Sequence, residues 1–175
     1  CVTGVQTCAL PISGIAHLAN GGDVSDLEAC IEEAFSVEVA TGNPWMHTDL
    51  ILLAHEKMLL WAHHGGMDLL PSPCIAEKPF SLRYNDRVVL EGSRDIIGLS
   101  AGSMKFGKSK PRRYRYTMTV HDWKFSDATH WKYDAWNHQR YDIQPTMYNN
   151  ATAVEYGVPI EEILFLYHVV QEKEI

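Results

Sequence analysis

Three runs of strand-forming residues follow one another between residues 74 and 126, and they constrain the fold more than any other feature of the sequence. They read CIAEKPFSLRY, RVVLEGSRDIIGL and RYTMTVHDWKFS, and each is rich in branched and aromatic residues. The polar, basic segment between the second and third runs, AGSMKFGKSKPRRYRY, is expected to form a loop. A fourth run, EILFLYHVV, closes the chain as a buried strand.

Helical periodicity surrounds these strands. Apolar residues recur at helical spacing from Ser25 onward, where Ser25 and Glu28 match a capping box. They recur again from about Met46 to His63, and the pair Gly65-Gly66 is expected to end this second helix. A further helix is expected over residues 137–156, with Pro145 near its first turn. The order of helices, three strands, helix and strand predicts an α/β domain, a mixed sheet of about four strands flanked by helices.

Composition excludes several classes of protein. The formal net charge of -7 does not indicate nucleic-acid binding by the chain as a whole, and no apolar run approaches the eighteen residues of a membrane span. The cysteines, Cys1, Cys8, Cys30 and Cys74, contain no CxxC pair, so neither a zinc ribbon, a redox centre nor an iron–sulfur cluster is expected. These features favour a reduced, cytoplasmic protein.

The opening stretch, CVTGVQTCALPISG, differs from the rest of the chain because it has no charge and no period. One choice of codons for Val2 to Ile12 spells the end of a widely used sequencing-library adapter. Residues 1–13 therefore resemble translated adapter and are excluded from the fold as not native. Residues 14–175 are then expected to form a single domain that is truncated at its N-terminus, with truncation at the C-terminus left open.

Two acids and a lysine lie within otherwise apolar strands. Asp122 and Lys124 share one face of their strand because alternate residues do, and Asp95 lies near the middle of the preceding run. Adjacent antiparallel strands can bring the two carboxylates within a few ångströms, where they repel unless a cation lies between them. Oxygen ligands suit Mg²⁺ or Mn²⁺. The alternative is a cross-face ion pair between Asp122 and Lys124 at a sheet edge.

The basic segment predicts a path for DNA. Six cations crowd a short stretch of an acidic chain, with aromatic residues between them: Lys105, Lys108, Lys110, Arg112, Arg113 and Arg115, alternating with Phe106, Tyr114 and Tyr116. Phosphate neutralisation combined with aromatic stacking suits single-stranded DNA. The alternative is a solvated hairpin tip without a ligand.

These elements together resemble a known family. The motifs Gly92-x-x-Asp95, Asp122-Trp123-Lys124 and Gln144-x-x-x-Tyr148 are similar to those of the RecB-like branch of the PD-(D/E)XK nuclease superfamily. Two further matches are a Gly-x-x-His motif at Gly14 and His17, and Glu77 as a glutamate ahead of the second strand's acid. The resemblance extends from about Gly14 to Val170, and it departs from the family at Arg94, where an apolar residue is usual.

The resemblance implies a restriction-endonuclease-like core and a Mg²⁺- or Mn²⁺-dependent DNA nuclease. Asp95 and Asp122 would hold one or two ions, together with His17, Glu77 and the backbone carbonyl of Trp123. Lys124 would orient or help deprotonate the attacking water, and Gln144 and Tyr148 would contact the DNA near the scissile phosphate. The expected activity is that of an exonuclease in repair, recombination or phage DNA processing, in a bacterium or a phage-infected host. Its expected substrate is single-stranded DNA or duplex ends, and a recombinase or helicase is the expected partner.

Two alternatives stay open. A CRISPR-associated RecB-like nuclease would carry an iron–sulfur cluster on four cysteines, and Cys30 and Cys74 alone do not supply that set. A non-catalytic DNA-binding module would keep the nuclease fold and leave the metal site idle.

Overall fold

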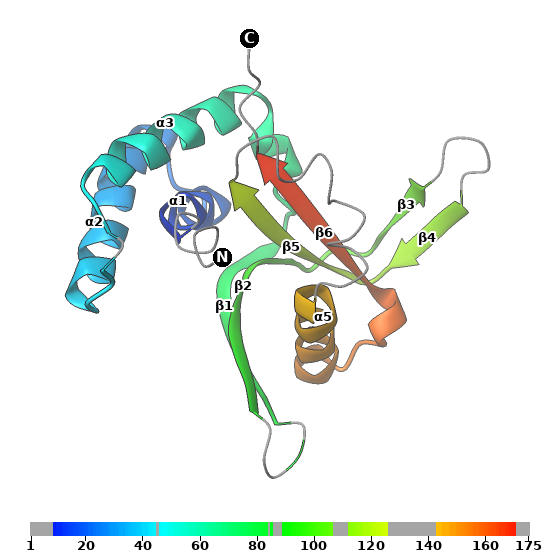
Figure 1. Ribbon diagram of the computed structural model, residues 1–175. Coiled ribbons are helices and arrows are strands. Elements are labelled where there is room, and N and C mark those ends of the chain that lie inside the picture. The colour runs from blue at the N-terminus through cyan, green and yellow to red at the C-terminus, as the bar shows by residue number, and fades with distance from the viewer. Residues whose placement is uncertain are drawn as a thin grey trace. The chain divides into compact units, whose positions relative to one another are not determined.

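A computed structural model of the chain describes residues 9–44, 46–83, 85, 89–106, 112–125 and 143–170 (Figure 1). The elements are α1 (Ala9–Ala19), η1 (Val24–Asp26), α2 (Leu27–Ala40), α3 (Asp49–His63), η2 (Gly66–Leu69), β1 (Cys74–Arg83), β2 (Val89–Gly98), β3 (Gly102–Phe106), β4 (Arg112–Tyr116), β5 (Met118–Phe125), α5 (Ile143–Tyr156), η3 (Ile160–Glu162) and β6 (Ile163–Val170). The described residues divide into two compact units: those within 9–70, 123–125 and 169–170 form the first, and those within 71–122 and 143–168 form the second. None of the helices in the described ranges is long and apolar enough to cross a membrane.

In the first unit, the helices α1, α2 and α3 pack on one another. Leu27 and Ile31 of α2 and Met58 of α3 are fully buried between them. Gly14 lets α1 approach closely, because an added Cβ would lie 3.2 Å from the Met58 side chain and 3.3 Å from that of Leu27. These contacts form a small helical core of their own.

The predicted helix ends are partly correct. Gly65 takes the left-handed conformation, with φ of 83°, directly after α3, as the Gly-Gly pair predicts. The capping box at Ser25 is wrong, because Asp23 accepts the hydrogen bond from the Ser25 backbone N–H at 2.9 Å and opens the short turn η1 before α2. An aspartate two residues earlier is the better acceptor for this turn.

Helix α1 begins inside the predicted adapter segment. Residues 9–13 are helical, and Leu10 is only 2% exposed. An apolar peptide joined to an amphipathic helix extends that helix whatever its origin, so the adapter assignment and the domain bounds that follow from it stay predictions.

The four-stranded sheet has the order β1-β2-β5-β6. The pairs β1–β2 and β2–β5 are antiparallel, whereas the arrows of β5 and β6 run in the same direction (Figure 1). The mixed sheet of about four strands is thus confirmed. One strand boundary is wrong: the predicted run over residues 115–126 is divided at Thr117, where β4 ends and β5 begins.

The predicted loop between the second and third strands is also wrong in part. Residues of that segment pair as the separate antiparallel hairpin β3–β4, in which Lys105 lies opposite Arg113 and Met104 opposite Tyr114. Six cations in a short segment with Gly and Pro favour a loop from composition alone, but the paired strands satisfy their backbone groups across the ribbon.

Helix α5 covers the sheet of the second unit. Val120 of β5, Tyr148 of α5 and Ile163 of β6 form a buried cluster, and the rings of Phe80 and Tyr148 meet edge to face with centroids 5.6 Å apart. Pro145 is the third residue of the helix, where its missing N–H costs no hydrogen bond, as expected. The part of the predicted helix before Ile143 lies outside the described residues.

Two histidines join β5 to β6. Nδ1 of His121 lies 2.8 Å from Nε2 of His168, the rings are coplanar within 5°, and Nε2 of His121 lies 2.9 Å from the Thr119 hydroxyl. Burial lowers the pKa of His121 to about 3, with a contribution from the neighbouring His168, and burial lowers that of His168 to about 4. Both rings are therefore neutral in the fold at neutral pH.

This pair predicts a loss of stability in acid. Below about pH 6.5 the unfolded chain binds protons at both histidines and the folded chain does not, so the free energy of unfolding falls by about 1.4 kcal/mol per pH unit and histidine until the folded pKa values are reached. Urea unfolding at pH 7.5 and pH 5 measures the effect. His168→Gln should reduce the difference between the two pH values, whereas His47→Gln, at an exposed position, should leave it unchanged.

Candidate functional site

Three acids lie in a row across three neighbouring strands. In the β1–β2 register Ala76 pairs with Ile96 and Lys78 with Arg94, which sets Glu77 opposite Asp95. In the β2–β5 register Ile96 pairs with His121, and continuing by one residue sets Asp95 opposite Asp122. Side chains directly opposite on antiparallel strands have Cβ atoms about 5 Å apart. The register thus supports the predicted proximity of the two aspartates and adds Glu77 to the row.

The sheet is irregular at this row. Gly92 and Arg94 of β2 both face α5, since an added Cβ at Gly92 would lie 3.8 Å from Tyr148 and Arg94 bonds to the helix. Ile97 pairs with Val120, which packs against Tyr148, so Ile97 belongs to the same face. Arg94 and Ile97 are three residues apart, whereas a regular strand returns to one face every two residues.

Glu77 explains the irregularity. Its φ is 47°, the only positive φ at a non-glycine residue among the described residues, and it lies opposite Asp95, where the β1–β2 ladder lacks a pair. This conformation costs a non-glycine residue about 1–2 kcal/mol. Glu77 is exposed overall, yet partial burial raises the pKa of its carboxyl group. Such breaks redirect side chains, and here the break accounts for Arg94 and Ile97 facing the same side although they are three residues apart.

Asp122 is the most deeply placed of the three acids. Its side chain is 1% exposed, and its Oδ1 accepts a hydrogen bond from Nε2 of Gln144 at 2.9 Å. The same amide nitrogen donates to the hydroxyl oxygen of Tyr148 at 2.8 Å. Gln144 and Tyr148 lie one turn apart on α5, as their spacing predicts, and the structure brings both to Asp122. Their contact with DNA stays a prediction.

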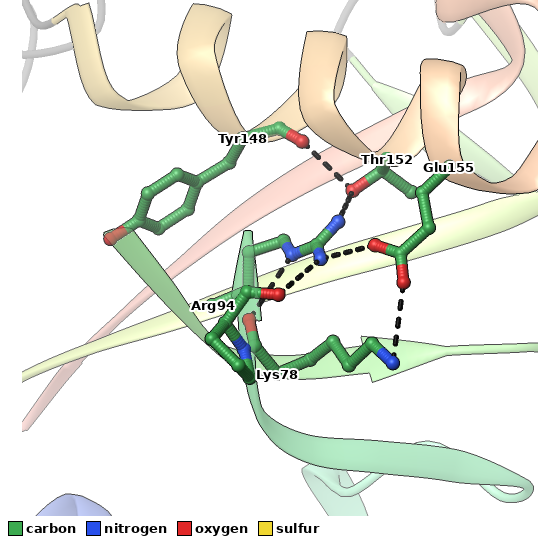
Figure 2. A network of polar contacts seen from close by, with 6 residues as sticks. Lys78, Arg94, Tyr148, Thr152 and Glu155 are labelled. Atoms are coloured by element: carbon green, nitrogen blue, oxygen red, sulfur yellow. Dashed lines mark hydrogen bonds and ion pairs between the residues drawn. The ribbon is translucent and has the colours of Figure 1, made fainter. Parts of the chain in front are cut away.

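Arg94 connects α5 to the β1–β2 ribbon (Figure 2). The guanidinium is fully buried, and it donates to Thr152 Oγ1 at 3.0 Å and to Glu155 Oε2 at 2.5 Å. It also donates to the backbone carbonyls of Lys78 and Pro79, at 3.4 and 3.3 Å. Bonds from both elements therefore converge on one cation, and this is the physical reason for a charged residue within an otherwise apolar strand.

The network continues along α5. The Thr152 hydroxyl accepts from Arg94 and donates to the backbone carbonyl of Tyr148 at 2.8 Å. Nζ of Lys78 lies 3.3 Å from Glu155 Oε1. Burial acts to raise the pKa of Glu155, but the hydrogen bonds and charges of Arg94 and Lys78 outweigh it, so the pKa lies below its ordinary value. The carboxylate is thus charged at neutral pH and neutralises the buried guanidinium.

Three further predicted site residues are described within the other unit. His17, Trp123 and Lys124 belong to the first unit, and their roles at the metal stay predictions. His17 lies in the last turn of α1, with Nε2 3.1 Å from the Asp23 carbonyl oxygen, and the ring of Trp123 meets that of Trp61 edge to face at 6.4 Å. Lys124 is half-buried on β5, two residues after Asp122.

The predicted DNA-binding residues are described in part. Lys105, Arg113 and Arg115 are exposed on the hairpin β3–β4. Lys108 and Lys110 lie outside the described residues, and of Arg112 only the backbone, in β4, is described.

The donor set favours a hard cation. Within the described ranges, no three His, Cys, Asp or Glu side chains are grouped closely enough to enclose a metal. Mg²⁺ does not require such a cage, because it keeps several waters and is held by one or two carboxylates together with substrate phosphates. Asp95 and Asp122, opposite each other with carboxylate oxygens only, fit that description.

Sequence reasoning named Gln144 and Tyr148 only through the family resemblance, and it missed the roles of Thr152 and Glu155. On α5, the polar side chains Gln144, Tyr148, Thr152 and Glu155 recur at spacings of four, four and three, which places them on one face. A polar stripe on the face that packs against a sheet, combined with an unexplained arginine in an apolar strand, is a signal for a buried network.

The two partners of Glu155 provide a matched test of this network. Arg94→Met removes a fully buried cation and is expected to lower the free energy of unfolding by about 2–3 kcal/mol. Lys78→Met removes a partly exposed partner of the same carboxylate and should cost less than about 1 kcal/mol. Urea unfolding measures both values, and equal costs would contradict the central role of Arg94.

Comparison with models of known protein families, with curated proteins and with solved structures finds no match to this chain. The functional interpretation therefore depends on the residues themselves and on the geometry around Asp122.

Proposed function

We propose that this chain is a metal-dependent DNA nuclease that hydrolyses phosphodiester bonds, acting as an exonuclease in repair, recombination or phage DNA processing. The alignment of Asp95 with Asp122, obtained by extending the β2–β5 register by one residue, supports the proposal. Neighbouring carboxylates repel one another, and a cation between them offsets that repulsion.

The carboxylates of Asp95 and Asp122 would hold the ion. Glu77 stays a predicted further ligand, because no three His, Cys, Asp or Glu side chains of the described residues group closely enough to enclose a metal. A bound Mg²⁺ or Mn²⁺ activates a water molecule at neutral pH and offsets charge on the phosphate. The amide of Gln144 fixes the orientation of Asp122 through its hydrogen bond to Oδ1. Such support of a metal ligand by a hydrogen bond from a neighbouring group is worth about 10- to 100-fold in affinity or activity.

Lys124 and Tyr148 are proposed to act on the substrate. Lys124, two residues after Asp122 on β5, would place a positive charge beside the scissile phosphate and orient or help deprotonate the attacking water. Tyr148, whose hydroxyl oxygen accepts from Gln144, would contact the DNA near the scissile phosphate.

Cleavage assays test the proposal. Labelled single-stranded and duplex DNA are incubated with the chain in Mg²⁺ or Mn²⁺, and EDTA should abolish cleavage. Asp122→Asn, which preserves shape, should lower the cleavage rate by more than about 100-fold because it removes a proposed metal ligand. Asp49→Asn, at an exposed position on α3, is the matched control and should cleave normally.

Two outcomes contradict the proposal. A folded wild-type chain without metal-dependent cleavage that still binds DNA would favour the non-catalytic DNA-binding module. An Asp122→Asn variant that cleaves at the wild-type rate would remove Asp122 from the site.

Glu77 offers a second test, because strain and charge can be separated there. Glu77→Gly relieves the positive φ and is expected to raise the free energy of unfolding by up to about 1 kcal/mol while lowering the cleavage rate. Glu77→Gln keeps the strain and removes the charge, so it should lower the rate without stabilising the fold. Unfolding in urea and cleavage in Mg²⁺ are measured for both variants, and a rate unchanged in both would exclude Glu77 from the site.

A further inference from the structure

The hairpin β3–β4 has one cationic face. Lys105 lies opposite Arg113, and Ser103 lies opposite Arg115, so these four side chains share a face of the ribbon. Lys105, Arg113 and Arg115 are all exposed, and Nε of Arg113 donates to the Ser103 hydroxyl at 2.9 Å. Three exposed cations are therefore presented together, with one of them fixed by a hydrogen bond.

The opposite face is aromatic. Met104 lies opposite Tyr114 and Gly102 opposite Tyr116, which places these residues on the other side of the ribbon. Tyr114 is 50% exposed. Tyr116 lies across Gly102, since a Cβ added there would be 2.5 Å from the tyrosine hydroxyl. The ribbon thus presents an exposed ring on the face opposite its charges.

Charge and anchoring make this hairpin distinct from the rest of the chain. Residues 96–121 contain six Lys and Arg and no Asp or Glu, whereas the remainder contains nine Lys and Arg against 22 acids. At the base of the hairpin, the backbone N–H of Thr117 donates to the Glu162 carbonyl at 2.8 Å, and the Thr117 hydroxyl donates to the Glu162 carboxylate. The positive field therefore extends from a fixed base.

We propose that this hairpin is a binding surface for single-stranded nucleic acid, with phosphates on the face of Lys105, Arg113 and Arg115 and an unpaired base stacked on Tyr114. A single strand offers both a flexible anionic backbone and a free base face. A duplex offers the charge alone, because its bases are already stacked, and an acidic peptide offers no base. This assignment rests on the proposed nuclease function and names single strands as the form of its substrate.

Binding assays in EDTA test the hairpin without any cleavage. Anisotropy is measured with labelled DNA and RNA strands that cannot self-pair, and with a duplex of the same length. Tyr114→Ala should weaken single-strand binding by about 5- to 100-fold and leave duplex binding unchanged, because base stacking on a ring is worth about 1–3 kcal/mol. Tyr114→Phe keeps the ring and is the matched control.

A second variant tests the cationic face through the salt dependence of binding. Arg113→Ala combined with Arg115→Ala should weaken single-strand and duplex binding alike, and reduce the slope of log affinity against log salt for single strands by about 1.4. Arg83→Ala, an exposed arginine at the end of β1, is the control and should keep the wild-type slope. Thermal unfolding confirms that each variant folds.

The inference is overturned if Tyr114→Ala leaves single-strand affinity unchanged, or if it weakens duplex binding to the same degree. Failure of the nuclease proposal gives a different pattern, in which the strand still binds in EDTA and no cleavage follows on addition of Mg²⁺.

Discussion

A single desolvated cation joins helix α5 to the β1–β2 ribbon of the second unit. A guanidinium buried without partners would cost several kcal/mol, so Arg94 must be surrounded by acceptors, and these come from two elements distant in the sequence. The carbonyls of β1 and the polar stripe of α5 supply them, and the ring of Phe80 lies 5.3 Å below the charge. Because the bonds are directional, they fix the helix along its axis as well as against the sheet. The amide of Gln144, on the same stripe, is thereby brought to Asp122.

The stabilising contacts of Arg94 and the strained backbone of Glu77 therefore lie on neighbouring strands. Arg94 is satisfied by its neighbours, while Glu77, on the adjacent strand, holds a conformation that its residue type disfavours. A backbone that keeps such strain beside a row of acids follows the pattern of sites in which geometry is maintained at a cost to stability. The break in alternation has a structural use in any case, since it lets Arg94 and Ile97, three residues apart, both lie on the face covered by α5.

The sequence predicted the features that depend on local pattern. Apolar alternation predicted the strands, and the pair Gly65-Gly66 predicted the end of α3. Acids within apolar strands marked Asp95 and Asp122 as candidate site residues. It could not reveal features that depend on distant partners. Glu155 lies 61 residues from Arg94, so no local spacing links them. The hairpin β3–β4 was missed because its alternation of cations and rings becomes a two-faced ribbon only once pairing is known, and the division at Thr117 depends on a bond to Glu162.

The position of the histidine pair has a consequence for enzymology. His121 directly precedes Asp122 on β5, so the two residues face opposite sides of one strand, and His168 joins that strand to β6. A fall in pH that protonates carboxylates on one side of β5 also favours protonation of the imidazoles on the other side. Protonation of the imidazoles weakens the contact between β5, which carries Asp122, and the edge strand β6. A decline of a rate at low pH would therefore combine titration of the acids with local opening of β5 and β6. The acid limb of a pH–rate profile must accordingly be read beside the pH dependence of unfolding before any apparent pKa is assigned to a carboxylate.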